Sequence, residues 1–194
     1  MLDITSELKE LRLHGMAEAW AELIDQGASS AETSKLLLEH LLRAEHTDRA
    51  MRSVRHQLNA AKFPVHRDLA RFDFESSKVD QKLVEQLATL SFTETAQNVV
   101  LIGGPGTGKT HLATAIAVSG IASKGKRVRF YSTVDLVNVL EREKHEGKAG
   151  RIAQTLMRMD LVILDELGYL PFSQAGGALL FHLLSKLYEH TSVI

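Results

Sequence analysis

Cysteine is missing from the 194 residues of this chain. Its absence excludes disulfide bonds, thiolate zinc sites and cysteine nucleophiles, and it fits a reducing compartment. Long apolar runs are missing too, since no stretch approaches the roughly 18 consecutive apolar residues of a membrane helix. The first residues do not show the basic segment and apolar stretch of a signal peptide. We therefore expect a cytoplasmic protein with no membrane partner.

The chain also lacks an excess of charge of either sign. Its 23 basic and 24 acidic residues leave a net charge of −1, so the overall charge does not indicate a polyanionic partner. Apolar residues make up 44% of the chain, which is enough for a substantial core. The length allows one domain of ordinary size, or a small module followed by a larger one.

A phosphate-loop pattern is present at 103–110, where G-x-x-x-x-G-K-[ST] is matched at every fixed position. An apolar run at 98–102 precedes it and a helix-forming run at 109–123 follows it, which is the strand–loop–helix context that the motif requires. These flanks weaken the alternative, a glycine-rich turn with an accidental Lys-Thr pair. The residues of the candidate loop are Gly103, Gly104, Pro105, Gly106, Thr107, Gly108, Lys109 and Thr110.

The residue types of this loop suit a nucleotide triphosphate. Glycines let the loop curl so that successive backbone N–H groups converge on an anion, and the following helix directs its positive dipole end to the same place. Lys109 is a mobile cation suited to the β- and γ-phosphates. The hydroxyl of Thr110 is suited to ligate Mg²⁺. The loop therefore predicts ATP and Mg²⁺ as cofactors.

An Asp165-Glu166 pair supplies a second candidate wall of the site, because it follows the apolar run 161–164. Carboxylates at the carboxyl end of a parallel strand lie at the ligand edge of an open α/β sheet. Asp165 is suited to hold Mg²⁺ opposite Thr110, and Glu166 to orient and deprotonate a water that attacks the γ-phosphate. The pair favours ATP hydrolysis, with Glu166 and Lys109 as the catalytic residues. The alternative is an Asp-Glu pair that merely ends a strand.

Strands that alternate with helices predict an α/β fold with a parallel sheet in the second half of the chain. The expected strands are 98–102, 127–131 and 161–164, and the last is apolar throughout, as in a strand buried on both faces. The run 132–135 has the pattern of a capping box that opens a further helix.

The first part of the chain is predicted to form a small all-α domain. Residues 1–62 contain no proline, and their apolar residues recur at helical spacing on both sides of a break at 27–30. Gly15 is a candidate for a second interruption, and Pro64 is expected to end the helical region.

A basic set lies near the end of this helical region, and no Asp or Glu occurs between its first and last members. Three positions, Arg49, Arg52 and His56, share one helix face by their spacing. One hypothesis is that the set follows a phosphodiester backbone, and the other is an ordinary solvated helix face. The basic set consists of Arg49, Arg52, Arg55, Lys62 and Arg67.

Three motifs together resemble one family. The run 165–171 (DELGYLP), the run 11–17 (LRLHGMA), and Phe63-Pro64 leading to 72–74 (FDF) are similar to the IstB-like ATPases, the helper proteins of IS21-type transposition. These are AAA+ ATPases related to the helicase loader DnaC. The resemblance covers nearly all of the chain.

The resemblance implies a P-loop fold of the AAA+ type, with ATP hydrolysis coupled to homo-oligomer assembly on DNA, duplex DNA being favoured, and to delivery of a target site to a transposase. It implies a helical domain at 1–66 for assembly and for DNA or transposase contact, a connector at 67–97 and an ATPase core at 98–194. It also favours DNA contact by the basic set. By analogy alone, the loop 144–151 is a further place for DNA contact.

The chain departs from the family at 191–194, which has the pattern of a fourth strand expected between the phosphate-loop strand and the Asp-Glu strand. The family's sensor residue and the arginine that reaches a neighbouring nucleotide are not in this sequence. We expect a core that is incomplete at the C-terminus. Because such an arginine contributes about 10³ or more in rate, this chain is expected to turn over ATP far more slowly than a complete relative in a steady-state assay.

Three alternatives remain open. A helicase loader of the same fold would prefer single-stranded DNA. A small-molecule phosphotransferase would need an acceptor, and phosphate release without one would exclude it. A non-hydrolysing ATP-binding assembly module would tolerate the loss of the Glu166 carboxylate.

Overall fold

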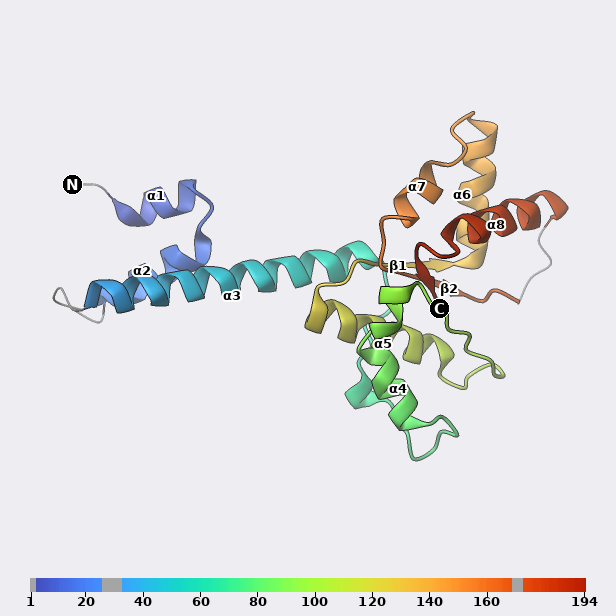
Figure 1. Cartoon of the computed structure of the whole chain (residues 1–194), viewed down its shortest axis with the longest axis horizontal. Helices are drawn as coiled ribbons and strands as arrows, with labels where there is room; N and C mark the ends of the chain where they lie inside the picture. Colours follow the sequence, from blue (N-terminus) through green and yellow to red (C-terminus); the bar gives the residue numbers. More distant parts are fainter. Residues whose placement is uncertain (1–2, 26–32, 169–172) are drawn as a thin grey trace. The chain divides into compact units, whose positions relative to one another are not determined.

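The computed structural model describes residues 3–25, 33–168 and 173–194, with the backbone alone at 33–36 and 38. The predicted break at 27–30 and the family-motif residues 169–171 lie outside the described residues. The chain divides into two compact units, Met1–Arg55 and His56–Ile194 (Figure 1). This division does not test the three functional segments expected from the sequence, 1–66, 67–97 and 98–194, which stay a prediction.

The first unit is helical, as expected, and contains α1 (Ile4–Glu10), α2 (His14–Asp25) and most of α3 (Thr33–Ala61). Gly15 does not interrupt a helix, because it lies buried within α2. A Cβ atom at Gly15 would lie 2.5 Å from the carbonyl oxygen of Ala44, so glycine allows α2 and α3 to pack closely here.

The helix α3 ends at Ala61, three residues before Pro64. Lys62 follows with a φ of 60°, in the left-handed region in which helices often end. Arg129 donates a hydrogen bond of 2.6 Å to the carbonyl oxygen of Ala60 and so pairs one of the carbonyls that a helix end leaves free. The predicted end of the helical region is confirmed.

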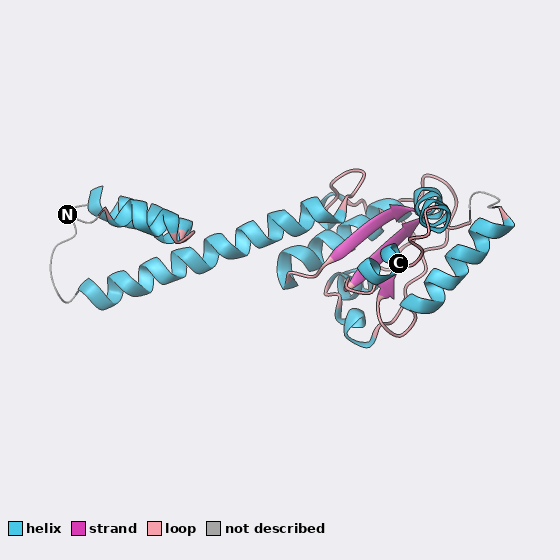
Figure 2. Cartoon of the chain, turned by 90° about the horizontal axis from the view of Figure 1, so that it is seen from above, coloured by secondary structure: helices cyan, strands magenta, loops and turns pink. Residues whose placement is uncertain are grey.

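The second unit contains a parallel sheet in the order β1-β2-β3, formed by β1 (Val128–Ser132), β2 (Leu161–Asp165) and β3 (Ser192–Val193) (Figure 2). The predicted strands 127–131 and 161–164 are confirmed to within one residue. The central strand β2 is buried at its first four positions, as its apolar sequence predicts.

Helices flank this sheet. The side chains of Val162 and Leu164 belong to a core that α6 (Thr133–His145), α7 (Arg151–Leu156) and α8 (Gln174–Leu187) complete. Strand residues alternate between the two faces, and α5 (Lys109–Lys124) also contacts β2. In turn, α4 (Gln81–Ala88) packs against α5, and short 3-10 helices occupy Leu69–Arg71 (η1) and Ser91–Thr95 (η2). The predicted fold class is confirmed.

The predicted strand at 98–102 is wrong, although this segment does lie beside the sheet. Val99 donates a backbone hydrogen bond of 2.9 Å to Val193, but no strand forms at 98–102. The partner strand β3 spans two residues, and no other strand among the described residues continues the ladder. Val100 and Ile102 are consequently 75% and 91% exposed. The expected position of the fourth strand, between this segment and the Asp-Glu strand, is confirmed.

The run 132–135 opens a helix, as predicted, but without the hydrogen bond of a capping box. Ser132 occupies the N-cap position of α6, but its side chain makes no capping hydrogen bond. The hydroxyl of Thr133 donates across the sheet edge to the carbonyl oxygen of Asp165, at 2.7 Å. This bond ties the first residue of α6 to the end of β2. Among the described helices, none is long and apolar enough to cross a membrane.

Candidate functional site

The loop 103–110 leads directly into α5, and two of its glycines are in the left-handed region. Gly106 has a φ of 74° and Gly108, the N-cap of α5, has a φ of 86°. Side chains with a Cβ rarely adopt these angles, so the glycine pattern has a backbone cause. The first turn of an α-helix leaves backbone N–H groups without helical partners. The loop therefore brings backbone donors and a helix N-terminus together, an arrangement suited to an anion.

The ammonium group of Lys109 lies over the loop. Its Nζ donates to the carbonyl oxygens of Gly103 at 2.8 Å and Gly104 at 2.7 Å, and the Thr107 hydroxyl donates to Gly104 at 2.9 Å. Because these bonds are on the exposed loop, an anion bound there can replace the carbonyl groups as the partner of Nζ. The positive charge is thus already positioned beside the candidate phosphate site.

The two walls expected from the sequence meet in the structure. The hydroxyl of Thr110 donates a hydrogen bond of 2.8 Å to Oδ2 of Asp165, across 55 positions of sequence. The other carboxylate oxygen, Oδ1, accepts from the backbone N–H of Glu166 at 3.1 Å. The hydrogen bond from the Thr133 hydroxyl to the Asp165 carbonyl oxygen ties the end of β2 to the first residue of α6. Asp165 is therefore positioned by three separate donors.

These residues fit a magnesium ion. A hydroxyl oxygen and a carboxylate oxygen lie 2.8 Å apart beside an anion-binding loop, and Mg²⁺ prefers oxygen ligands that include one or two carboxylates and substrate phosphates. Thr110 and Asp165 are the residues that would hold the ion.

Glu166 has an unusual backbone for a residue other than glycine, with a φ of 63°. Such conformations cost about 1–3 kcal/mol and cluster at functional sites. Glu166 and Lys109 line the same cavity of about 720 Å³, together with 98–102 and residues near the end of β3. The two predicted catalytic residues are thus brought to one space, which is otherwise largely apolar.

A second cavity, of about 950 Å³, is lined by 106–109 and by 71–73 and 76–79 of the connector. Gly103 and Lys109 line both cavities. A ligand that lies along the loop can therefore reach from the space beside Glu166 to the space beside the connector.

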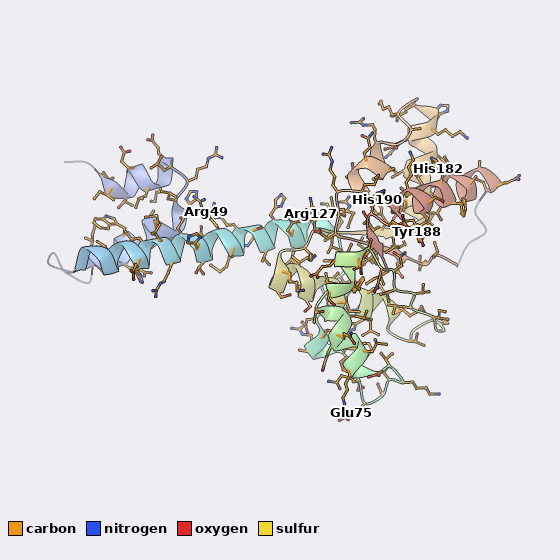
Figure 3. The ribbon with its side chains drawn as sticks, viewed as in Figure 1. Arg49, Glu75, Arg127, His182, Tyr188 and His190 are labelled. Carbon is orange, nitrogen blue, oxygen red and sulfur yellow. The ribbon has the colours of Figure 1, made fainter. Side chains whose placement is uncertain are left out.

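The residues of the basic set do not form one uniform stripe of free positive charge. Arg49, which is labelled in Figure 3, forms an ion pair of 2.5 Å with Glu45. Arg52 pairs with Asp48 at 2.7 Å and with Glu45 at 3.5 Å. Among the described residues, Arg55, Lys62 and Arg67 are exposed and have no such partner. The acidic partners, Glu45 and Asp48, lie just before the range 49–67 that contains the basic set. Each precedes its arginine by four residues, a spacing that predicts an ion pair on a helix.

Glu45 is the buried centre of this ion-pair group, and only 4% of it is exposed. Its Oε2 accepts the backbone N–H groups of Gly15 at 3.0 Å and Met16 at 3.3 Å, in the first turn of α2. Burial tends to raise the pKa of Glu45, but the hydrogen bonds from Arg49, Met16 and Gly15 and the Arg49 charge outweigh it, so the pKa is lowered. Arg49 and Arg52 thus have a structural task within the first unit.

Sequence reasoning also missed His111, the residue after Thr110. Its Nε2 lies 3.2 Å from the carbonyl oxygen of Asp68, in the connector. The signal was weak, because only the fold brings positions separated by 43 residues together.

Comparison with known proteins identifies a matching family and similar proteins. The family model described as IstB-like ATP binding protein matches residues 6–194. The ATP-binding protein of insertion sequence IS21 from Pseudomonas aeruginosa is 35% identical over 188 residues, which are 96% of this chain and 71% of that protein. The corresponding protein of IS5376 from Geobacillus stearothermophilus is 33% identical over 185 residues, covering 95% of this chain and 73% of that protein.

Among solved structures, the DnaC helicase loader is similar with a TM-score of 0.53 and 26% identity. The match covers 58% of this chain and 65% of that chain. It supports the AAA+ type of P-loop fold.

Proposed function

Because this chain belongs to the family of IstB-like ATP binding proteins, we propose that it is an ATP-dependent, DNA-binding helper ATPase of insertion-sequence transposition. The single observation that carries the catalytic part is the 2.8 Å hydrogen bond between Thr110 and Asp165. It joins the phosphate loop to the strand end that carries Glu166, so one site holds donors for phosphates, ligands for a metal and a carboxylate for a water.

In this proposal, each residue acts on a different part of the reaction. The backbone N–H groups of 103–110 and the Lys109 ammonium hold the phosphates, and Thr110 and Asp165 hold Mg²⁺. When bound, Mg²⁺ neutralises charge on the β- and γ-phosphates. Glu166 orients a water and accepts its proton as the water oxygen bonds to the γ-phosphorus. The bond between that phosphorus and the oxygen bridging to the β-phosphate breaks, so that ADP and phosphate are the products.

The assembly part of the proposal is supported by the family and by the relatives, which are ATP-binding proteins of insertion sequences. We propose duplex DNA, a transposase and further copies of the same chain as partners, with a cytoplasmic location. The helical region 1–66 would serve assembly and partner contact, 67–97 would connect, and 98–194 would bind the nucleotide. Arg55, Lys62 and Arg67 are the members of the basic set best placed for phosphodiester contact, because their charges have no ion-pair partner among the described residues.

Nucleotide binding is tested by Lys109→Ala. Loss of hydrogen bonds to a charged group costs about 1.5–3 kcal/mol, so the Kd for MgATP should rise by about 10- to 150-fold in isothermal titration calorimetry. Lys124→Ala is the matched control, because Lys124 ends the same helix and pairs with Glu94 away from the loop. Equal affinity of the Lys109 variant and the native chain would reject this site.

A helicase loader is the second candidate, favoured by the 26% identity with DnaC over 58% of this chain. The two functions differ in the DNA that they hold in the presence of ATP. Fluorescence anisotropy with duplex and single-stranded oligonucleotides of equal length separates them. A preference for the duplex supports the transposition helper, and a preference for the single strand supports the loader.

A further inference from the structure

His111 joins the phosphate loop to the connector that precedes it. The residue lies in the first turn of α5, and its Nε2 is 3.2 Å from the carbonyl oxygen of Asp68. Since a carbonyl oxygen can only accept a hydrogen bond, Nε2 carries the hydrogen and donates it. The interaction therefore defines which ring nitrogen is protonated when the imidazole is neutral.

The connector has a local structure that suits this contact. Asp68 is the N-cap of η1, and its Oδ1 accepts the backbone N–H of Arg71 at 3.1 Å. Phe72 follows at the end of η1, and its ring meets the His111 ring edge to face, with centroids 5.2 Å apart and planes at 89°. His111 thus contacts both ends of η1, one by a hydrogen bond and the other by an aromatic pair.

Phe72 in turn lies against the phosphate loop itself. A Cβ atom at Gly108 would be 2.8 Å from the Phe72 ring, so the ring fills the space that glycine leaves. Phe74 packs against Phe72 with centroids 4.8 Å apart. The connector is therefore held against the last glycine of the loop, directly before the helix that points at the phosphate site.

This contact builds one wall of the larger cavity. The 950 Å³ space is lined by Phe72, Gly108 and His111 together with connector residues such as Ser77 and Val79. Neither Asp165 nor Glu166 lines it, whereas Glu166 lines the other cavity. A nucleotide with its terminal phosphate near Glu166 would therefore extend its nucleoside part along the loop toward the connector.

We propose that His111 is a positioning residue. It holds η1 and Phe72 against the phosphate loop, and this arrangement places the connector where it contacts the nucleoside of a bound nucleotide. The inference rests on the proposed function, since it concerns ATP at the same site. The inference divides the affinity for ATP into two contributions, one from the triphosphate and one from the nucleoside. The loop recognises the triphosphate, and the connector held by His111 recognises the rest of the nucleotide.

The test compares two probes, ATP and inorganic triphosphate, each with Mg²⁺, by calorimetric titration of the full chain. In His111→Ala, ATP affinity should fall about tenfold, the effect of a lost hydrogen bond with some loss of packing, while triphosphate affinity stays within about twofold. Phe72→Ala should behave alike, and His111→Gln, which can still donate from its side-chain amide, should recover most of the ATP affinity. His182→Ala, at an exposed position on α8 (Figure 3), is the matched control.

Each other outcome overturns the inference. Equal losses for both probes in His111→Ala would mean that His111 supports the loop rather than the nucleoside wall. Unchanged ATP affinity in both His111→Ala and Phe72→Ala would mean that the connector does not recognise the nucleoside. A native chain that binds neither probe would reject the proposed function itself, and the inference with it.

Discussion

Glu45 in the helical unit and Asp165 in the sheet unit are both carboxylates that accept hydrogen bonds from the first turn of a helix. Glu45 accepts two backbone N–H groups of α2 and is buried, with two arginines beside it. Asp165 accepts the hydroxyl of Thr110 in α5 and is only partly buried, at the end of β2. The residue chemistry is the same, but the surroundings differ.

The difference shows how burial separates a structural carboxylate from a candidate ligand site. The partners of Glu45 all belong to its own unit, so its charge is already compensated and any exchange would leave a buried ion unpaired. Asp165 lies partly exposed at the end of β2, beside the phosphate loop, so its oxygens can exchange partners at less cost. The basic residues divide in the same way, with Arg49 in an ion pair and Arg55 exposed.

The largest expected effect lies at the sheet edge. Glu166→Gln should lower ATP turnover by about 10²- to 10⁴-fold, the usual contribution of a general base, while MgATP binding and the unfolding midpoint stay near native values. Phosphate release and calorimetric titration measure the two. DNA complexes formed with ATP should then fail to disassemble.

Glu189→Gln is the control for this substitution. Glu189 is exposed in the same unit and has a φ of 64°, close to the 63° of Glu166, so it tests the same amide in the same backbone conformation. Native turnover in the Glu166 variant would show that Glu166 is not the catalytic base. Native DNA binding and release in that variant, with no ATP turnover in the native chain, would favour the non-hydrolysing assembly module.

The next largest effect is expected in the helical unit. Glu45→Gln removes the charge that Arg49 and Arg52 surround and weakens the cap of α2, which should cost about 1–3 kcal/mol of unfolding free energy. Hydrogen exchange of residues 14–25 should become faster, while ATP affinity is unchanged. Glu39→Gln is the control, because Glu39 forms an exposed pair with Arg43 at the same spacing on α3. A loss of ATP affinity in the Glu45 variant would contradict the division between the two carboxylates.

Acid should affect the same unit through Glu45. Its pKa is lowered from the ordinary value of 4.5 in the folded chain, because the hydrogen bonds and charge of Arg49 outweigh burial. The ionised carboxylate therefore stabilises the fold above pH 4.5, and this stabilisation is lost as the pH falls through the lowered pKa. Urea unfolding between pH 7 and pH 3 should show a smaller acid loss in Glu45→Gln than in the native chain. Identical acid losses would show that Glu45 is not the group responsible.

The smallest effect is expected for DNA. Arg55→Ala should reduce the slope of log affinity against log salt by about 1, as expected for one lost phosphate contact. Arg49→Ala should change that slope less and destabilise the helical unit more, since Arg49 is paired with Glu45. Salt titrations by fluorescence anisotropy measure both slopes. If the two variants lose equal slope, the basic set acts as one stripe despite its ion pairs.

The phosphate loop, β1 and β2 could be predicted because their signals are local. Gly106 and Gly108 are needed where the backbone has a positive φ, and an apolar run such as 161–164 has one stable place, in the middle of a parallel sheet. The end of α3 before Pro64 is local as well. In each case, interactions between residues close in sequence are enough to determine the local structure.

The strand expected at 98–102 shows where local signals end. Its residues suit a strand, but a strand also needs a ladder partner, and β3 supplies one only as far as Val193. A similar limit applies to Ser132, which takes the N-cap position of α6 as its pattern predicts but makes no side-chain capping hydrogen bond. Propensity describes what a segment can do, and the partner decides whether it does so.

By itself, the sequence determined which residues could bind a nucleotide, because glycine positions, a lysine, a hydroxyl and two carboxylates are chemical facts of the chain. Only the tertiary structure decided which of them meet. Thr110 reaches Asp165 across 55 positions and His111 reaches Asp68 across 43, since parallel packing and helix docking bring together groups that no local pattern relates. Burial likewise assigned Arg49 to the fold and left Arg55 exposed, because the buried carboxylate of Glu45 needed a cation to compensate its charge.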